Sequence, residues 1–346
     1  MTESAADFRS DTVTRPTPAM RRAMAEAEVG DDVLDGDPTV RLLEQEAARW
    51  LGKEGAWYVP SGTMANQVAA GVWTRPGDEV IAEQRAHIVL YESGALGYLH
   101  GVQTTTLRGE RGALDPDELR NAVRPDFLHC PRTALVCVEQ TNLESGGRVV
   151  PLDRLRAVRD VASELGLPVH MDGARLANAV AASGVPAAEW AACADSVSVC
   201  LSKGLGAPVG SIIAGDAAFL ERAKLVRKRL GGWMRQAGIL AAAGRIALAE
   251  GVERLPDDHR LARDLAERLD SIPGLSCAAA EVETNIVFVS VDDERFDAPM
   301  LSVKLEERGV RAMPQAERVL RCVTHRDVGP ADVERLESAL RSILSD

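Results

Sequence analysis

The chain has 346 residues, enough for one large and one smaller domain. Of these residues 46% are hydrophobic and 27% are charged, which is ordinary for a soluble globular protein. The formal net charge of −12 argues against a nucleic-acid-binding surface, which needs clustered positive charge. Residues 1–20 lack the pattern of a secretion signal, and no apolar run approaches the length of a membrane span, so we expect a cytoplasmic protein without a membrane partner.

The metal-ligating residue types are scattered. None of the six cysteines forms a CxxC pair, and none of the six histidines belongs to an HExxH or similar motif. We therefore expect no metal site, and we expect the cysteines to be small buried residues in a reducing compartment.

The N-terminal two thirds of the chain predict helices and strands that alternate. A polar arm over residues 1–14 precedes helices over Ala19–Glu28 and Thr39–Trp50, and further helices are expected after Ser61 and over Leu152–Leu165. The predicted strands are Ala56–Pro60, Asp78–Glu83, Val102–Leu107, Thr133–Gln140, Leu167–Asp172 and the alternating run Val197, Val199, Leu201. This rhythm predicts an α/β fold with a mostly parallel sheet between helices, in which ligands bind beyond the carboxyl ends of the strands.

The C-terminal third predicts a second, smaller α/β unit. A helical stretch over Leu225–Arg254 is interrupted at Gly231-Gly232 and continues over His259–Leu269. After Gly274 the pattern predicts strands over Thr284–Val291 and near Leu320–Thr324, and helices over Ala298–Arg308 and Pro330–Leu344. We expect an N-terminal arm over residues 1–20, a large domain over 21–250 and a small C-terminal domain over 251–346.

Lys203 lies where the last strand of the large domain breaks into Gly204, Gly206 and Gly210. A lysine in such a place can be an ordinary solvated turn residue. It can also form an imine (a Schiff base) with a carbonyl carbon, which is how lysine anchors pyridoxal phosphate. The choice between these interpretations depends on the rest of the chain.

Other residues at predicted strand ends suit such a cofactor. Ser61, Gly62 and Thr63 open a helix and could bind a phosphate, although they could equally be a plain helix cap. Asp172 could keep a pyridine nitrogen protonated, or could cap the next element. His87 could stack on a flat ring, and the guanidinium groups of Arg175 and Arg321 could each bind a carboxylate, although each of the three could also be an ordinary polar residue.

The order and spacing of these residues resemble fold-type I pyridoxal phosphate-dependent enzymes, with a large domain and a smaller C-terminal α/β domain. The match narrows to the low-specificity L-threonine aldolase family through blocks that span nearly the whole chain. These blocks are Phe8–Met20, Val29–Val40, Pro60–Asn66, Gly77–Ile88, His170–Arg175, Ser198–Ser211, Gly231–Gly238, Thr284–Val289 and Arg321–Val328.

The resemblance implies a carbon–carbon lyase that splits an L-β-hydroxy-α-amino acid, such as threonine or allo-threonine, into glycine and an aldehyde. Lys203, His87 and Asp172 would be catalytic, and the cofactor would also contact Ser61, Gly62, Thr63, Arg175 and Arg235, the last from a neighbouring subunit. The substrate would contact Ser10, Leu34, Tyr91, Asn142, Arg175 and Arg321. Because the family shares its sites between subunits, a homo-oligomer is implied, either a dimer or a dimer of dimers.

Two positions depart from the family pattern. Leu34 stands where the family has a tyrosine, and Asn142 stands where the family has a histidine. An amide cannot act as a general base at neutral pH, so the β-hydroxyl proton would need another acceptor, such as water or His87.

Two other functions stay open. The same scaffold supports β-elimination, racemisation and transamination, because all of them begin from a carbanion at Cα. A non-catalytic cofactor-binding protein is a third possibility, which the joint presence of Lys203, Asp172 and Arg175 disfavours.

Overall fold

The computed structural model describes residues 5–345 and contains a central seven-stranded sheet in the order β2-β8-β7-β6-β5-β3-β4. Its strands are β2 (Gly55–Val59), β3 (Glu79–Glu83), β4 (Gln103–Leu107), β5 (Thr133–Glu139), β6 (Val169–Asp172), β7 (Ser196–Cys200) and β8 (Ser211–Gly215). Six of these strands run in the same direction, and β8 runs opposite to them. The predicted mostly parallel sheet is therefore confirmed.

The strand β8 is an element that the sequence pattern did not indicate. It follows the glycine-rich turn after Lys203, where Gly206 and Gly210 adopt φ values of +82° and +107° and reverse the chain. All five residues of β8 are buried between β2 and β7. A short apolar run after several glycines has no periodicity of its own, so only its neighbours in the sheet define it as a strand.

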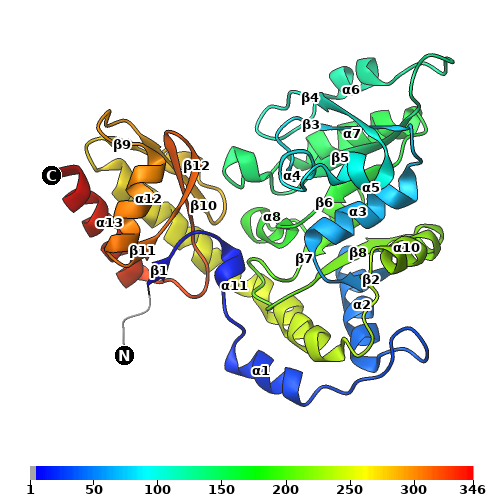
Figure 1. Cartoon of the computed structure of the whole chain (residues 1–346), viewed down its shortest axis with the longest axis horizontal. Helices are drawn as coiled ribbons and strands as arrows, with labels where there is room; N and C mark the ends of the chain where they lie inside the picture. Colours follow the sequence, from blue (N-terminus) through cyan, green and yellow to red (C-terminus); the bar gives the residue numbers. More distant parts are fainter. Residues whose placement is uncertain (1–4, 346) are drawn as a thin grey trace.

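Helices cover both faces of the sheet (Figure 1). In β5, Val136 and Val138 belong to one apolar core, whereas Leu135 and Cys137 belong to another on the opposite face. The helices are α2 (Pro38–Leu51), α3 (Gly62–Trp73), α4 (His87–Leu90), α5 (Ala95–His100), α6 (Pro116–Ala122), α7 (Leu152–Glu164), α8 (Leu176–Ser183), α9 (Ala187–Ala191) and α10 (Ala217–Arg229). A sheet covered on both faces leaves its strand ends as the place for a ligand.

A single helix, α11 (Gly238–Asp270), runs from the large part of the molecule to the smaller one (Figure 1). It is longer than predicted and passes through Pro256 without a break. The helical stretch is interrupted at Gly231, as predicted. This glycine comes just after the end of α10 and has a φ of +78°.

The C-terminal part has a four-stranded antiparallel sheet in the order β12-β13-β10-β9. Its elements are β9 (Leu275–Ser276), β10 (Ile286–Val291), α12 (Ala298–Glu307), β11 (Val310–Arg311), β12 (Met313–Ala316), β13 (Val319–Val323) and α13 (Pro330–Ser345). The helix α11 contributes to two apolar cores. Leu255 belongs to the core of the large part, and Ala262 belongs to the core of the smaller part. The division at residue 251 therefore falls inside one helix, and we retain it as a proposal.

Residues 6–8 of the N-terminal arm pack on this smaller part (Figure 1). Its strand β1 (Ala6–Asp7) pairs in parallel with β11, and Phe8 is fully buried in the C-terminal core. The chain then forms α1 (Pro18–Ala25), which packs against α11. The arm thus brings Ser10 to a cavity that Arg175 and Lys203 also line.

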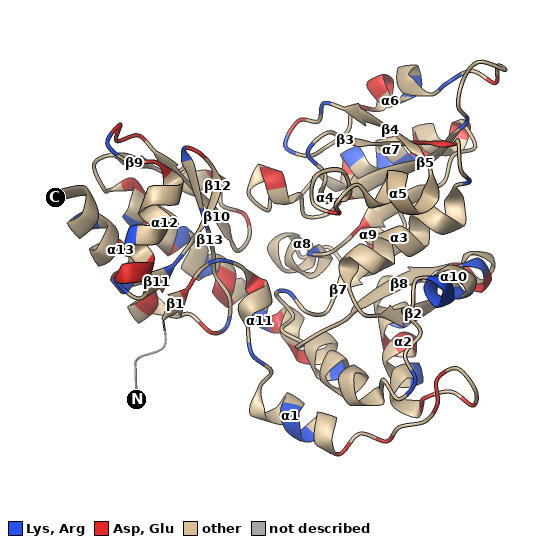
Figure 2. Ribbon diagram, in the orientation of Figure 1, with Lys and Arg blue, Asp and Glu red and all other residues tan. Residues whose placement is uncertain are grey.

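Charged residues are spread over both parts, and α10 is rich in basic side chains (Figure 2). One of them, Arg227, is fully buried and pairs with Asp32 at 3.2 Å, so some of this charge is neutralised within the chain. Across residues 5–345, no helix combines the length and apolarity that crossing a membrane requires.

Candidate active site

The first cavity lies at the carboxyl ends of β6 and β7. Asp172, the last residue of β6, is opposite Ser198 of β7, and Lys203 follows β7 by three residues. The lining residues are Ser61, Gly62, Thr63, Asn66, His87, Asp172, Ala174, Cys200, Ser202 and Lys203. The structure thus brings together the predicted residues Ser61, Gly62, Thr63, His87, Asp172 and Lys203.

Asp172 is buried and fixed by two hydrogen bonds. Its Oδ1 accepts from the backbone N–H of Ala174 at 3.0 Å, and its Oδ2 accepts from Asn66 Nδ2 at 2.8 Å. Burial alone would raise the pKa of this carboxyl, but the charges of Lys203 and His87 and the bond from Asn66 hold it below its ordinary value. Asp172 is therefore an ionised, immobile acceptor, which suits a protonated ring nitrogen.

Asn66, which the sequence analysis missed, holds this carboxylate in place. Its Nδ2 donates both to Asp172 and to Glu92 Oε1, the latter at 2.7 Å. Its Oδ1 accepts from Ser198 Oγ at 2.9 Å and lies 3.0 Å from His170 Nε2. Because the amide nitrogen already donates to two carboxylates, the amide oxygen must be the acceptor and His170 Nε2 must carry a proton.

The hydrogen bonds continue from His170 into the core. Burial lowers the pKa of His170 to about 4, so the ring is neutral and its Nδ1 accepts from Ser196 Oγ at 3.0 Å. Ser196 Oγ in turn accepts from Trp73 Nε1 at 3.0 Å. A chain of hydrogen bonds with one consistent direction therefore fixes the orientation of Asn66, and through it that of Asp172.

His87 begins α4 and lines this cavity from another side. Its Nδ1 lies 3.1 Å from Glu92 Oε1, and its backbone N–H donates to Glu139 Oε2 at 3.1 Å. Burial lowers the pKa of the imidazole, but the bond to Glu92 and the charge of Asp172 raise it overall. Although His87, Glu92 and Asp172 lie close enough to share a metal ion, hydrogen bonds from His87 and Asn66 already occupy the two carboxylates.

The N-terminus of α3 forms the anion-binding end of the cavity. Ser61 is the N-cap, and its Oγ accepts from the backbone N–H of Met64 at 3.1 Å. Within residues 5–345, the backbone N–H groups of Gly62 and Thr63 make no hydrogen bond. A Cβ at Gly62 would lie 2.6 Å from Cys200 Sγ, so only glycine fits here. Two free N–H groups at a helix N-terminus suit a phosphate.

A second cavity adjoins the first, because His87 and Lys203 line both. It lies between the large sheet and the smaller domain. The lining residues are Ser10, Thr12, His87, Tyr91, Leu143, Arg175, Lys203, Met313, Pro314, Gln315 and Arg321. The structure thus assembles the predicted substrate residues Ser10, Tyr91, Arg175 and Arg321 from four distant segments.

Arg175 is buried and paired with Asp11, a residue that the sequence analysis did not select. Its Nε donates to Asp11 Oδ2 at 2.9 Å, and its NH2 donates to Asp11 Oδ1 at 2.7 Å. Although burial opposes ionisation, the guanidinium lowers the pKa of Asp11 to about 2. One edge of the Arg175 fork is therefore occupied, and the NH1 edge is what Arg175 can offer a ligand.

Arg321, on β13, approaches the same cavity from the smaller domain. Its NH1 donates to Gln315 Oε1 at 3.1 Å, and its NH2 donates to the backbone oxygen of Arg9 at 3.2 Å. Its Nε is buried without a partner in the described part of the chain. Burial and the charge of Arg175 lower the pKa of Arg321. Two neighbouring guanidiniums with unused donors suit a carboxylate ligand.

Three predicted site residues lie outside both cavities. Leu34 is 74% exposed, and Arg235 NH1 pairs with Asp31 at 3.0 Å in the same neighbourhood. Asn142 is buried, where its Nδ2 donates to Glu139 Oε2 at 2.9 Å and its Oδ1 accepts from the backbone N–H of Ser145. A single chain therefore does not bring Leu34, Arg235 or Asn142 to the site.

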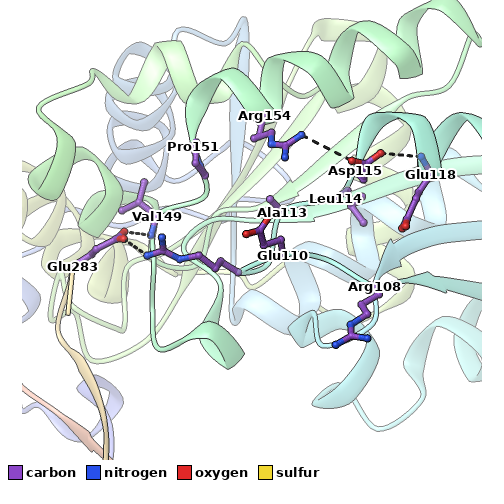
Figure 3. A pocket seen from close by; sticks show the side chains of 11 residues that line it. Arg108, Glu110, Ala113, Leu114, Asp115, Glu118, Val149, Pro151, Arg154 and Glu283 are labelled. Atoms are coloured by element: carbon purple, nitrogen blue, oxygen red, sulfur yellow. Dashed lines mark hydrogen bonds and ion pairs between the residues drawn. The ribbon is translucent and has the colours of Figure 1, made fainter. Parts of the chain in front are cut away.

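A further hollow lies between the β4–α6 connection and the start of α7 (Figure 3). Its charged side chains largely bind one another and the backbone. Arg111 pairs with Glu283 at 2.7 Å, Glu283 also accepts from the backbone N–H of Val149, and Arg154 points toward Asp115 (Figure 3). No lysine lines this hollow, and we assign the active site to the two joined cavities instead.

Comparisons with known proteins show which family and which solved structures the chain is similar to. The model of the beta-eliminating lyase family matches residues 7–294. A low-specificity L-threonine aldolase of Arabidopsis thaliana is 46% identical over 332 residues, which cover 94% of this chain and 93% of the relative. A low specificity L-threonine aldolase of Escherichia coli K12 is 40% identical over 343 residues, covering 98% and 99%. The solved structure of a Leishmania major threonine aldolase shares the fold, with a TM-score of 0.81, 20% identity and coverage of 98% and 99%.

Proposed function

The chain belongs to the beta-eliminating lyase family, and we propose that it is a pyridoxal phosphate-dependent carbon–carbon lyase. It cleaves an L-β-hydroxy-α-amino acid, threonine or a close analogue, to glycine and an aldehyde. The observation that carries this proposal is the joining of two cavities at Lys203, one that suits a phosphate and a ring nitrogen and one that suits a carboxylate. The printed activity of the near-full-length relatives supports the substrate class.

Lys203 is the lysine that can reach both ligands. The other four lysines of the sequence, Lys53, Lys224, Lys228 and Lys304, line neither cavity. Within residues 5–345, the side-chain amine of Lys203 makes no hydrogen bond or ion pair, so it is available to bind the aldehyde carbon of the cofactor. The same amine is placed to move a proton at the substrate Cα.

The chain positions the cofactor by three contacts. The N–H groups of Gly62 and Thr63 would bind the phosphate, His87 would cover the ring face, and Asp172 would hold a proton at the ring nitrogen. When bound in this way, pyridoxal phosphate supplies an electron sink for the electron pair of the broken Cα–Cβ bond. Because Asp172 is ionised and oriented by Asn66, its carboxylate would hold that proton in a fixed position.

The substrate is oriented through its carboxylate. The NH1 edge of Arg175 and the unpartnered Nε of Arg321 would bind the two carboxylate oxygens, and Ser10 lies on the same cavity wall. Fixing the carboxylate would set the orientation of the bonds at Cα, and with it which of these bonds breaks. Cleavage rather than proton loss therefore depends on these two arginines.

We also propose that the enzyme is a cytoplasmic homo-oligomer, a dimer or a dimer of dimers. Arg235 and Leu34 lie together, away from the cavities of their own chain, which is the arrangement expected if they complete the site of a neighbouring subunit. The cytoplasmic location is supported by six cysteines that form no disulfide, five of them buried.

Product analysis tests the proposed reaction. The holoenzyme is incubated with L-threonine, L-allo-threonine and L-phenylserine, and glycine, aldehyde, keto acid and ammonia are quantified. Equimolar glycine and aldehyde are expected, and they should be lost in Lys203→Ala but kept in Lys228→Ala, which changes an exposed lysine on α10. Keto acid with ammonia would instead identify β-elimination and contradict the proposal.

A further inference from the structure

The substrate cavity contains a hydrogen-bonded group of Tyr91, Glu144 and Gln315, which the predicted substrate contact of Tyr91 does not explain. Tyr91, at the end of α4, donates through its hydroxyl to Glu144 Oε1 at 2.5 Å. Gln315, on β12, donates through Nε2 to the same Glu144 oxygen and to Tyr91 Oη, the latter at 2.9 Å. Tyr91 and Gln315 line the cavity, and Glu144 lies behind them in the turn that follows β5.

Glu144 is placed to accept the hydrogen bond of the Tyr91 phenol. The Glu144 side chain is 10% exposed and also accepts from Arg85 NH2 at 3.0 Å. Burial and the neighbouring Glu144 carboxylate raise the pKa of Tyr91 to about 12, so the phenol stays protonated and donates to Glu144. The phenol oxygen accepts from Gln315, which leaves one lone pair for a ligand in the cavity.

The group is linked to the arginine that binds the substrate carboxylate. Gln315 Oε1 accepts from Arg321 NH1 at 3.1 Å, while Gln315 Nε2 donates to Tyr91. One glutamine amide therefore sets the separation between Arg321 and the phenol. A ligand whose carboxylate lies on Arg321 would place its neighbouring polar substituents toward Tyr91.

Other residues on the cavity are less suited to accept a proton. The bond to Glu92 raises the pKa of His87 and uses its Nδ1. Arg175 and Arg321 have no acceptor atoms. Asn142, the position at which the family pattern has a histidine, is turned into the protein and bonded to Glu139 and Ser145.

We propose that Tyr91 is the catalytic residue that receives the proton of the substrate β-hydroxyl, and that Glu144 is its positioning residue. This inference rests on the proposed aldol cleavage. The β-O–H bond breaks and a new O–H bond forms at Tyr91 Oη, while the original Tyr91 proton passes to Glu144 Oε1. The electron pair of the broken β-O–H bond forms the carbonyl of the aldehyde as the Cα–Cβ bond breaks. The Cα electron pair goes to the bound cofactor that the proposed function already requires.

The test separates hydroxyl deprotonation from every other step. The holoenzyme and the variants Tyr91→Phe, Glu144→Gln and Tyr98→Phe are compared for threonine cleavage, for the dissociation constant of glycine and for exchange of the glycine Cα proton in D2O. Glycine has no β-hydroxyl, so its binding and exchange need the cofactor and the arginines but not Tyr91. Tyr98 is 88% exposed on α5 and serves as the matched control.

For Tyr91→Phe we expect kcat for cleavage to fall about 100-fold, with KM and both glycine measurements changed less than about 3-fold. Glu144→Gln should lower kcat by a smaller factor with KM changed less than about 3-fold, because an amide cannot take up the proton that Tyr91 passes on. Tyr98→Phe should behave like the unaltered enzyme.

Two results would overturn the inference. If Tyr91→Phe kept its cleavage rate, or lost glycine exchange as severely as cleavage, Tyr91 would not be the proton acceptor. If the unaltered holoenzyme exchanged the glycine proton but released no aldehyde from any β-hydroxy amino acid, the proposed function itself would fail, and the inference with it.

Discussion

The two joined cavities are built in different ways. The cofactor cavity is formed at the ends of neighbouring strands and the start of one helix. Its key polar residues, Asn66 and Asp172, are only 1% and 4% exposed. The substrate cavity is formed by the N-terminal arm, the α4 end, the β5 turn and the smaller domain, and it includes Tyr91 at 46% exposure and Met313 at 37%. Cofactor binding thus depends on buried residues at the strand ends of the large sheet. Substrate choice depends on segments whose positions are set by the packing of the smaller domain.

The largest effect is expected from the cofactor side. Asp172→Asn keeps the size and shape of the side chain, but its amide can accept only one of the two hydrogen bonds that the carboxylate accepts, and it cannot hold a proton at the ring nitrogen. We expect kcat for cleavage to fall roughly 1000-fold, because the electron sink is lost while the cavity stays intact. Steady-state cleavage assays with a melting curve check this. If Asp172→Asn kept the cleavage rate of the unaltered enzyme, the electron sink would not depend on Asp172.

The next largest effect is expected from the link between the arm and the substrate cavity. Asp11→Ala leaves the buried Arg175 unpaired, and removing one partner of a buried ion pair costs about 3–5 kcal/mol of unfolding free energy. Urea unfolding measures this loss, and Asp31→Ala, which removes an exposed ion pair with Arg235, is the matched control. Equal losses in the two variants would show that the arm is not held by the buried pair.

A pH experiment probes the hydrogen-bonded chain behind Asp172. The folded protein keeps His170 neutral with a pKa of about 4, below its ordinary value of 6.5. As the pH falls from about 7 to 5, the unfolded chain takes up this proton before the folded one, so His170 lowers stability by about 2 kcal/mol over that range. His170→Gln should remove this part of the decrease. The exposed His129→Gln should not, and identical curves for the two variants would contradict the neutral assignment.

The smallest effect is expected at position 142. Because Asn142 lies outside both cavities, Asn142→His should change cleavage of threonine, allo-threonine and phenylserine less than about 3-fold. Initial rates on the three substrates measure this. A large gain on any of them would show that residue 142 reaches the substrate, and that Tyr91 and Glu144 are not sufficient.

The same contrast explains what the sequence could predict. Three parts of the site follow local patterns that neighbouring residues reveal. Asp172 ends a strand, Lys203 precedes a glycine-rich turn, and Ser61 through Thr63 begin a helix. Asn66 lies one helical turn after Gly62, so its placement on the same face of α3 was open to prediction, but its bond to Asp172 was not.

Long-range packing created the features that sequence reasoning missed. Asp11 meets Arg175 across 164 positions, and Gln315 meets Tyr91 across 224, so no spacing in the chain signals either pair. Asn142 was selected through the family pattern, but it lies outside both cavities. A position chosen through the family pattern carries a different residue here, and the amide caps the turn over Leu143–Ser145 instead of lining the site.

The most direct test of the account is to find the lysine that binds the cofactor. The holoenzyme is reduced with borohydride to fix the cofactor covalently, digested, and mapped by mass spectrometry across all five lysines of the sequence. We expect one modified site, Lys203, which lies where the two cavities join. Modification at Lys53, Lys224, Lys228 or Lys304, with Lys203 unmodified, would contradict it.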